Sequence, residues 1–247
     1  EILTPEQGFG LEGVLRDRAT DLVGILNGID DHDWNPWTDR FITCHYGETS
    51  LAIKRDCKAA LQRAVGLPEK RAVPLIAMIS RLTLQKGFDL IEDIFDKLIE
   101  RDAQIVLLGS GEPRFEDFFR AAAMRHPDRV AVEIGFNEAL AHRIEAGADL
   151  FLMPSLYEPC GLNQMFSQKY GTIPIVRAVG GLKDTVQDYD AASGTGTGFV
   201  FGRYDSGALL AAIDRALAAF ADEQAWNALR RRAMAMDFSW DSSAKVY

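Results

Sequence analysis

The chain has 247 residues, 47% of them hydrophobic, so it is long and apolar enough to bury the core of one or two domains. This composition excludes an intrinsically disordered chain. The formal net charge of -9 argues against duplex DNA or an anionic membrane surface as a partner, because the attraction between phosphate groups and a basic protein would be reversed.

Residues 31–47 carry Trp34, Pro36, Trp37 and two more aromatic residues, and we expect them to form an extended linker. The chain starts at Glu1 rather than at a methionine. It closes on SWDSSAKVY, a pattern typical of a helix still in progress. We therefore expect both ends to be cut from a longer chain.

From Pro74 to Phe201, short apolar runs alternate with longer amphipathic stretches, which is typical of βαβ units and a parallel sheet. The runs are continuous and apolar, as strands covered on both faces must be. The expected strands are Pro74–Ser80, Gln104–Gly109, Val130–Gly135, Leu150–Ser155 and Ile173–Val179, with Gly198–Phe201 as a sixth. Right-handed crossovers then predict an α/β fold with a doubly wound, Rossmann-like parallel sheet.

The amphipathic stretches are expected to form helices that cover this sheet. They are Lys86–Arg101, Arg114–Arg125, Asn137–Ala146 and Gly161–Tyr170, followed by Ser206–Phe220 and Glu223–Met236. Asn137 is well placed to cap its helix. Because ligands of doubly wound sheets bind beyond the carboxyl ends of the strands, the segments that follow the strands are where chemistry is expected.

The first such segment is SRLTLQKG, in which Arg81 directly follows a strand and Lys86 opens the next expected helix. Two cations thus converge on one strand end. A leaving diphosphate gains negative charge as its bond to a sugar breaks, and fixed guanidinium and ammonium groups stabilise that charge without a metal. A pair of solvated surface charges is the alternative interpretation.

The second segment is LYEPCGLNQM, which places a carboxylate and a glycine between the fourth expected strand and a helix expected to open at Gly161. The backbone N–H groups of Gly161, Leu162 and Asn163 would be unpaired there and available to a phosphate. Glu158 would then lie beside a sugar, or else act as a capping or first-turn acid of the helix.

The third segment begins with Phe136, where a nucleotide base could stack on the ring, although an aromatic residue at such a position usually belongs to the core. The Gly109–Gly111 stretch lacks the full glycine fingerprint of a dinucleotide site, and the sequence has no P-loop motif. The sequence therefore argues against an enzyme that transfers hydride from a dinucleotide and against a P-loop hydrolase.

The cysteines and histidines give no sign of a metal site or a disulfide framework. Cys44, Cys57 and Cys160 are odd in number and far apart, which fits a reducing cytoplasm, and the four histidines lack metal-ligand spacing. Cys160 is interpreted as a small buried side chain rather than a nucleophile. No secretory signal and no apolar run near the ~20 residues of a membrane span is found, so we expect a cytoplasmic location without membrane partners.

Long ordered motifs in this chain resemble those of bacterial glycogen synthases and plant starch synthases. They are TPEQGFGLEGVL, GILNGIDDHDWNP, SRLTLQKG, IGFNEALAHRIEAGADLFLMPSLYEPCGLNQM and the stretch from FGRYD to MDFSW. The resemblance implies the C-terminal lobe of a two-lobed glycosyltransferase B fold. By that resemblance, residues 1–27 are the tail of the N-terminal acceptor lobe, 28–50 the inter-lobe linker, and 51–247 the nucleotide-sugar-binding domain.

The resemblance also implies a retaining transfer of glucose from ADP-glucose to the non-reducing end of an α-1,4-glucan, with no cofactor and no metal. The glucan would bind through the missing N-terminal lobe, so the chain alone would bind donor without turning it over. In this interpretation Arg81 and Lys86 hold the diphosphate and Glu158 bonds to the glucose. The Gly161–Asn163 amides bind the distal phosphate, and Phe136 stacks on adenine.

Two departures from the family pattern lie in these motifs. Phe136 stands where relatives usually have tyrosine, and AVGGL replaces the usual Arg-Thr-Gly-Gly-Leu. We interpret AVGGL as a loop whose glycines Gly180 and Gly181 border the site together with Cys160. Two alternatives stay open: a non-catalytic nucleotide- or glucan-binding module, and a two-lobed transferase that uses a UDP-sugar.

Overall fold

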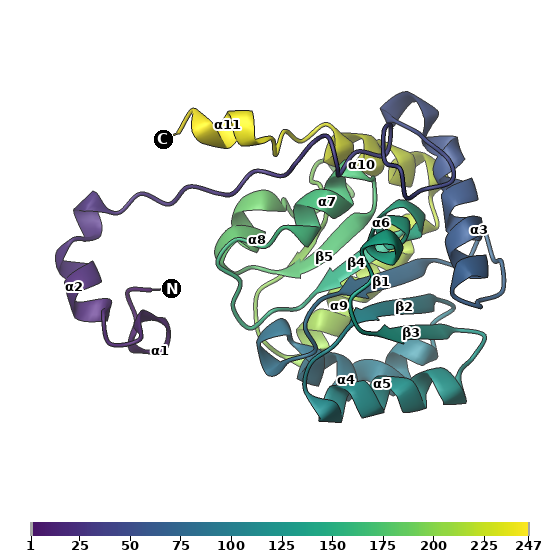
Figure 1. Cartoon of the computed structure of the whole chain (residues 1–247), viewed down its shortest axis with the longest axis horizontal. Coiled ribbons are helices and arrows are strands. Elements are labelled where there is room, and N and C mark those ends of the chain that lie inside the picture. The colour runs from purple at the N-terminus through teal and green to yellow at the C-terminus, as the bar shows by residue number, and fades with distance from the viewer. Residues whose placement is uncertain (1, 247) are drawn as a thin grey trace.

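Six parallel strands form the centre of the computed structural model, which describes residues 2–246 (Figure 1). Their order in the sheet is β3-β2-β1-β4-β5-β6, and every neighbouring pair runs parallel. The strands are β1 (Leu75–Ile79), β2 (Gln104–Gly109), β3 (Val130–Ile134), β4 (Leu150–Met153), β5 (Ile173–Arg177) and β6 (Phe199–Phe201). The predicted doubly wound sheet is therefore confirmed, including its short sixth strand.

Helices flank the sheet. They are α3 (Lys54–Ala64), α4 (Phe88–Ile99), α5 (Pro113–Arg125), α6 (Glu138–Gly147), α7 (Asn163–Lys169), α8 (Gly180–Thr185), α9 (Ser206–Phe220) and α10 (Glu223–Met234). A last helix, α11 (Trp240–Ala244), buries no residue and lies away from the sheet (Figure 1). The 3-10 turns η2 (Glu48–Ile53) and η3 (Leu84–Lys86) precede α3 and α4. Asn137 caps α6 as expected, because its side chain accepts a hydrogen bond from the Leu140 N–H at 3.0 Å.

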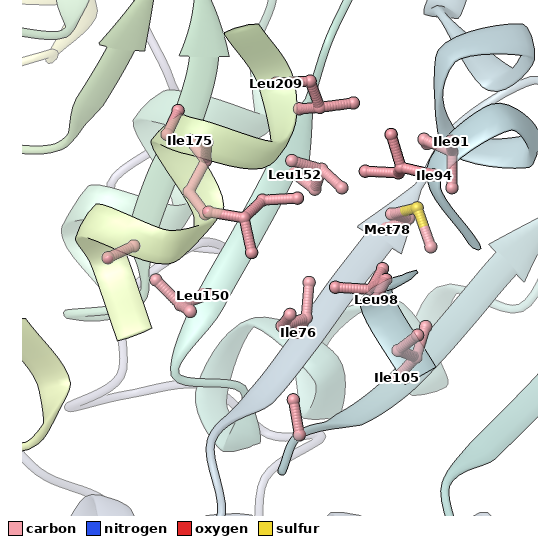
Figure 2. Packing of buried hydrophobic residues seen from close by; sticks show 14 of the residues in the cluster. Ile76, Met78, Ile91, Ile94, Leu98, Ile105, Leu150, Leu152, Ile175 and Leu209 are labelled. Atoms are coloured by element: carbon pink, nitrogen blue, oxygen red, sulfur yellow. The ribbon is translucent and has the colours of Figure 1, made fainter. Parts of the chain in front are cut away.

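The two faces of the sheet carry separate apolar cores because successive strand residues point in opposite directions. In β1, Ile76 and Met78 pack into the core formed with α4, α5 and α9, whereas Leu75 and Ala77 pack with α3 and α6. Figure 2 shows the first of these cores, with residues of β1 and β4 against residues of α4 and α9. Burial on both faces explains why each strand reads as a continuous apolar run.

The first residues of the chain form an arm that leaves the α/β body (Figure 1). This arm contains α1 (Pro5–Gly8), α2 (Glu12–Asp17) and the 3-10 turn η1 (Ala19–Asp21), and several of its apolar side chains, such as Phe9 at 84% exposure, face solvent. The chain joins the body at Ile29, whose N–H donates to the Phe238 carbonyl oxygen at 2.8 Å. The division into lobe tail, linker and donor domain stays a prediction.

Residues 31–47 lie against the body rather than extending from it. Asp39 is buried, and its carboxylate accepts hydrogen bonds from His142 at 2.8 Å and from the Tyr170 hydroxyl at 2.5 Å. The Trp34 ring stacks between His142 and Phe166, with centroid distances of 3.8 and 3.9 Å. The expectation of an extended segment is therefore wrong, because Trp34 packs on α6 and α7 and Asp39 is hydrogen-bonded to the body.

Candidate functional site

A cavity of about 360 Å³ opens at the carboxyl ends of β1 and β4. The strand order reverses between these two strands, so the cavity lies at the switch point where doubly wound sheets bind ligands. Its walls include six residues singled out in the sequence: Arg81, Lys86, Glu158, Gly161, Leu162 and Asn163. Segments more than 70 residues apart in the chain thus meet in one cavity.

Lys86 does not open a helix, contrary to the sequence-based expectation. It ends the 3-10 turn η3, and Gly87 follows with a φ of 77°, in the left-handed region that favours glycine. A Cβ atom at Gly87 would lie 2.2 Å from the carbonyl oxygen of Pro154. The backbones after β1 and β4 therefore approach closely at Gly87, and this approach brings Lys86 next to the segment that carries Glu158.

Glu158 is the buried acid of the cavity, with 6% of its surface exposed. Its Oε2 atom accepts hydrogen bonds from Lys86 Nζ at 2.5 Å and from Ser155 Oγ at 3.2 Å. A buried carboxylate is costly unless it is paired, and these two donors supply the pairing. The Lys86 ammonium has three N–H donors, so it can keep this bond while it donates to a second anion.

Arg81 lies at the exposed rim of the same cavity. Its guanidinium donates to Gln85 Oε1 at 3.2 Å, and Gln85 Nε2 donates in turn to the Tyr157 carbonyl oxygen at 3.3 Å. Two cations and one carboxylate are the charged side chains that line the cavity. This balance leaves a net positive charge suited to a diphosphate.

The segment Gly161–Asn163 forms the turn before α7. The expected helix start at Gly161 is wrong by two residues, because Gly161 has a φ of 74° and α7 begins at Asn163. Among residues 2–246, the N–H groups of Gly161, Leu162 and Asn163 donate no backbone hydrogen bond. The Asn163 side chain donates to the Ile79 carbonyl oxygen at 2.6 Å, which ties this turn to the end of β1.

Gly181 contacts the turn that carries Glu158 through its backbone, and neither Gly180 nor Gly181 lines the cavity. The AVGGL segment is part helix rather than loop, since α8 starts at Gly180. The Gly181 N–H donates to the Glu158 carbonyl oxygen at 3.1 Å, and a Cβ atom at Gly181 would lie 2.2 Å from the Cys160 carbonyl oxygen. This close packing holds the turn between Glu158 and Cys160, whose own thiol is free and half-buried.

Phe136 lies apart from these residues, directly after β3 at the edge of the sheet. Its side chain is 93% exposed and is not part of the cavity wall. It does not belong to the core, which was the alternative interpretation. A fully exposed ring is available for stacking, but its role stays a prediction.

Arg177 is a supporting residue that carried no role in the sequence-based prediction. It ends β5, and its Nη1 atom donates to the carbonyl oxygens of Ser155 at 3.2 Å and Leu156 at 2.5 Å. Its guanidinium also lies 5.2 Å from the centre of the Tyr204 ring. Its position in the sequence could have indicated this role. Arg177 lies at the carboxyl end of the strand next to β4, and the carboxyl ends of neighbouring parallel strands lie side by side.

Comparison with known proteins places this cavity in a family context. The family model described as "Glycosyl transferases group 1" matches residues 60–232. The chain is 58% identical, over its whole length, to the glycogen synthase of Anaeromyxobacter sp. (strain Fw109-5), of which it covers 52%. It is 49% identical to the glycogen synthase of Bacillus anthracis over 97% of the chain and 50% of that protein. The chain thus spans about half the length of the curated relatives it matches.

Solved structures show the same relationship. The catalytic domain of starch synthase IV from Arabidopsis thaliana, bound to ADP and acarbose, is 38% identical and superposes with a TM-score of 0.93 over the whole chain and 52% of that structure. A sucrose-phosphate synthase from Thermosynechococcus elongatus, at 22% identity and a TM-score of 0.65, shares the fold. These findings confirm the resemblance and the predicted fold class, the Rossmann-like C-terminal lobe of a glycosyltransferase B fold. Within residues 2–246, no helix is long and apolar enough to cross a bilayer, and no group of acidic, histidine and cysteine residues could hold a metal ion.

Proposed function

Because the chain belongs to the family of glycosyl transferases group 1, we propose that it is the donor-binding half of a retaining glucosyltransferase. Its substrates are ADP-glucose and the non-reducing end of an α-1,4-glucan. The names of the relatives, glycogen synthase and starch synthase, support this reaction, and the starch synthase structure was obtained with ADP. The other half of the longer relatives supplies the acceptor lobe, so this chain alone binds donor without turnover.

The observation that carries the proposal is the convergence of Arg81, Lys86 and Glu158 on one cavity at the switch point of the sheet. The two cations hold the diphosphate of the donor, and the unpaired amides of Gly161–Asn163 receive its distal phosphate. Glu158 then faces the hexose and accepts hydrogen bonds from its hydroxyl groups. The exposed Phe136 ring stacks on adenine.

The chemistry follows from this charge arrangement. The bond between glucose C1 and the diphosphate oxygen breaks while the glucan 4-hydroxyl attacks C1 from the same face, which retains the anomeric configuration. The hydroxyl proton passes to the departing diphosphate oxygen. Arg81 and Lys86 stabilise the charge that develops on the leaving diphosphate. No covalent enzyme nucleophile is needed, and closure of the two lobes excludes the water that would hydrolyse the donor.

Calorimetry of the chain with ADP tests the cation assignment. We expect Arg81→Ala and Lys86→Ala each to weaken ADP binding at least about tenfold, because a hydrogen bond to a charged group contributes roughly 1.5–3 kcal/mol. Arg114→Ala is the matched control, since its guanidinium pairs with Glu92 on the surface away from the cavity. A folded chain that does not bind ADP, or binding that neither variant weakens, contradicts the proposal.

Two further titrations test the hexose contact and the base. Glu158→Gln should lower the affinity for ADP-glucose relative to that for ADP, because the substitution removes an acceptor for the sugar and leaves the diphosphate contacts in place. An unchanged ratio favours a nucleotide-binding module without transferase chemistry. Tighter binding of UDP than of ADP favours a transferase that uses a UDP-sugar.

A further inference from the structure

A second cavity lies at the opposite ends of the same two strands, the amino ends of β1 and β4. Its wall includes Pro74 and Asp149, the residues directly before these two strands, together with residues of α3, α9 and α10. Its volume is about 660 Å³, against about 360 Å³ for the cavity at the carboxyl ends. This size is in the range of small-molecule sites.

Basic side chains dominate the wall of this cavity. Six basic and three acidic residues line it, in a chain with a net charge of -9. The basic residues are Lys54, Arg55, Lys58, Arg71, Arg101 and Arg230, and the acidic ones are Asp102, Asp149 and Glu223. A local excess of positive charge on an acidic protein concentrates small anions at that point.

The buried part of the wall has more cations than carboxylates. Asp149 Oδ2 accepts from Lys58 Nζ and Asp149 Oδ1 from Arg230, both at 2.6 Å. Lys54 Nζ donates to neutral oxygens, with Thr172 Oγ1 at 2.7 Å as its nearest acceptor. Burial and the neighbouring positive charge of Arg230 lower the pKa of Lys54 to about 7. Even with Lys54 partly neutral, Lys58 and Arg230 share the single carboxylate of Asp149, so the positive charge of this wall is incompletely compensated.

Two buried donors in the wall lack an acceptor. In the part of the chain that the structure describes, neither Arg230 Nε nor Trp226 Nε1 has a hydrogen-bond partner, although these residues are 6% and 3% exposed. The Arg230 guanidinium lies over the Trp226 ring, 5.6 Å from its centre, so the two side chains are packed together. Unsatisfied buried donors are rare in folded proteins and call for an acceptor.

The rim of the cavity carries two further cations, each in an exposed ion pair. Arg71 has 71% of its side chain exposed, and its nearest carboxylate is Asp56 at 3.5 Å. Arg55 pairs with Glu223, and both side chains are largely open to solvent. Such exposed pairs contribute little to stability, so their guanidinium groups can turn to a ligand at small cost. Next to this rim, Leu217 and Phe220 provide an apolar wall.

We propose that this cavity binds a small molecule in which a phosphate group is attached to an apolar or aromatic body. Arg55 and Arg71 hold the phosphate at the rim, the buried cations of the wall add positive potential behind it, and the body packs on Phe220. The site is distinct from the donor cavity and lies at the other end of the same two strands. It does not depend on the proposed transferase activity.

Calorimetry with phenyl phosphate as the probe tests this site. The double variant Arg55→Ala/Arg71→Ala should fold, because both pairs are exposed, and should bind phenyl phosphate at least about tenfold more weakly. Arg125→Ala removes an exposed cation that does not line the cavity and should leave the affinity unchanged. No binding, or binding lost in Arg81→Ala and kept in the double variant, overturns the proposal, because the anion then binds at most in the donor cavity.

A second measurement reports on the wall itself. The indole N–H resonance of Trp226 is assigned by its disappearance from the nitrogen–proton NMR spectrum of Trp226→Phe. Phenyl phosphate should shift this resonance in the wild-type chain, with the same concentration dependence as the calorimetric titration. An indole resonance that stays in place while phenyl phosphate binds overturns the assignment of the ligand to this cavity.

Discussion

The two ends of the β1–β4 pair use charged side chains in opposite ways. At the carboxyl ends, Arg81 is exposed and donates to a neutral glutamine, and Lys86 shares one ion pair with Glu158. At the amino ends, the Lys58 ammonium is buried and donates to Asp149 and to two backbone carbonyl oxygens. The first arrangement leaves donor capacity free for a ligand, whereas Lys58 uses its three donors to join α3 to the sheet.

This difference follows from the elements that carry the charges. Lys86 lies in a 3-10 turn followed by a left-handed glycine, and Glu158 lies in a loop, so both can adjust when a ligand arrives. Lys58 lies within α3 and Asp149 directly before β4, where helix and strand fix the backbone. Substitutions of the buried Lys58–Asp149–Arg230 cluster should therefore change stability, and those at the carboxyl ends should change binding.

The largest effect is expected for Asp149→Asn. The substitution leaves Lys58 and Arg230 buried without their common counter-charge. It also replaces one carboxylate oxygen by an NH₂ group, which faces groups that are themselves hydrogen-bond donors. Breaking a buried ion pair in this way should lower the free energy of unfolding by about 3–5 kcal/mol. Urea unfolding at neutral pH, followed by circular dichroism, measures the loss.

Asp214→Asn is the matched control for this substitution. It breaks the Arg101–Asp214 pair on the surface, where the two side chains are 25% and 47% exposed. The expected loss is below about 1 kcal/mol. Equal losses for the two variants would mean that burial does not separate the amino-end cluster from ordinary surface pairs.

A smaller effect is expected from the pH dependence of Glu145, which lies on α6 beside this cluster. Burial raises the pKa of Glu145 from 4.5 to about 8, although the Ser167 hydroxyl and Lys54 act in the other direction. The folded chain therefore keeps a proton on Glu145 that the unfolded chain releases above pH 4.5. The stabilisation is fully present below pH 4.5 and is lost as the pH rises towards 8.

Glu145→Gln isolates this contribution because glutamine imitates the neutral acid at every pH. Between pH 5 and pH 7, the wild type should lose roughly 2 kcal/mol of stability relative to the variant, since one pKa unit corresponds to about 1.4 kcal/mol. Urea unfolding of both proteins at pH 5, 6 and 7 measures the difference. Parallel pH profiles would show that Glu145 titrates alike in the folded and unfolded chains.

The same contrast separates what the sequence could and could not predict. The strands were predictable because burial on both faces leaves continuous apolar runs, and Arg81 and Glu158 were predictable because they follow such runs. The starts of α4 and α7 were misplaced because Gly87 and Gly161 adopt left-handed backbone conformations, which at Gly87 go with close approach to the backbone of Pro154.

The amino-end cavity was not predictable from spacing. Lys54 and Lys58 lie on α3 in the first part of the chain, whereas Arg230 lies on α10 near its end. In sequence, each is a charged residue of an amphipathic helix, which usually faces solvent. Their burial follows from how α3 and α10 pack at the amino ends of the strands, which is a tertiary property.

The smallest effect is expected for Phe136→Tyr at the carboxyl edge, where the family usually has tyrosine. The side chain is 93% exposed, so an added hydroxyl meets water in the free protein and should leave the unfolding free energy unchanged. If the ring stacks on adenine, the hydroxyl can add one hydrogen bond to the nucleotide, a gain of about 0.5–1.5 kcal/mol, or a two- to tenfold tighter affinity for ADP. Calorimetry of both proteins with ADP measures this gain.

Phe136→Ala should weaken ADP binding, because the stacking face is lost. An ADP affinity that is unchanged in both variants would exclude Phe136 from the site. Nucleotide recognition would then be restricted to the cavity between β1 and β4.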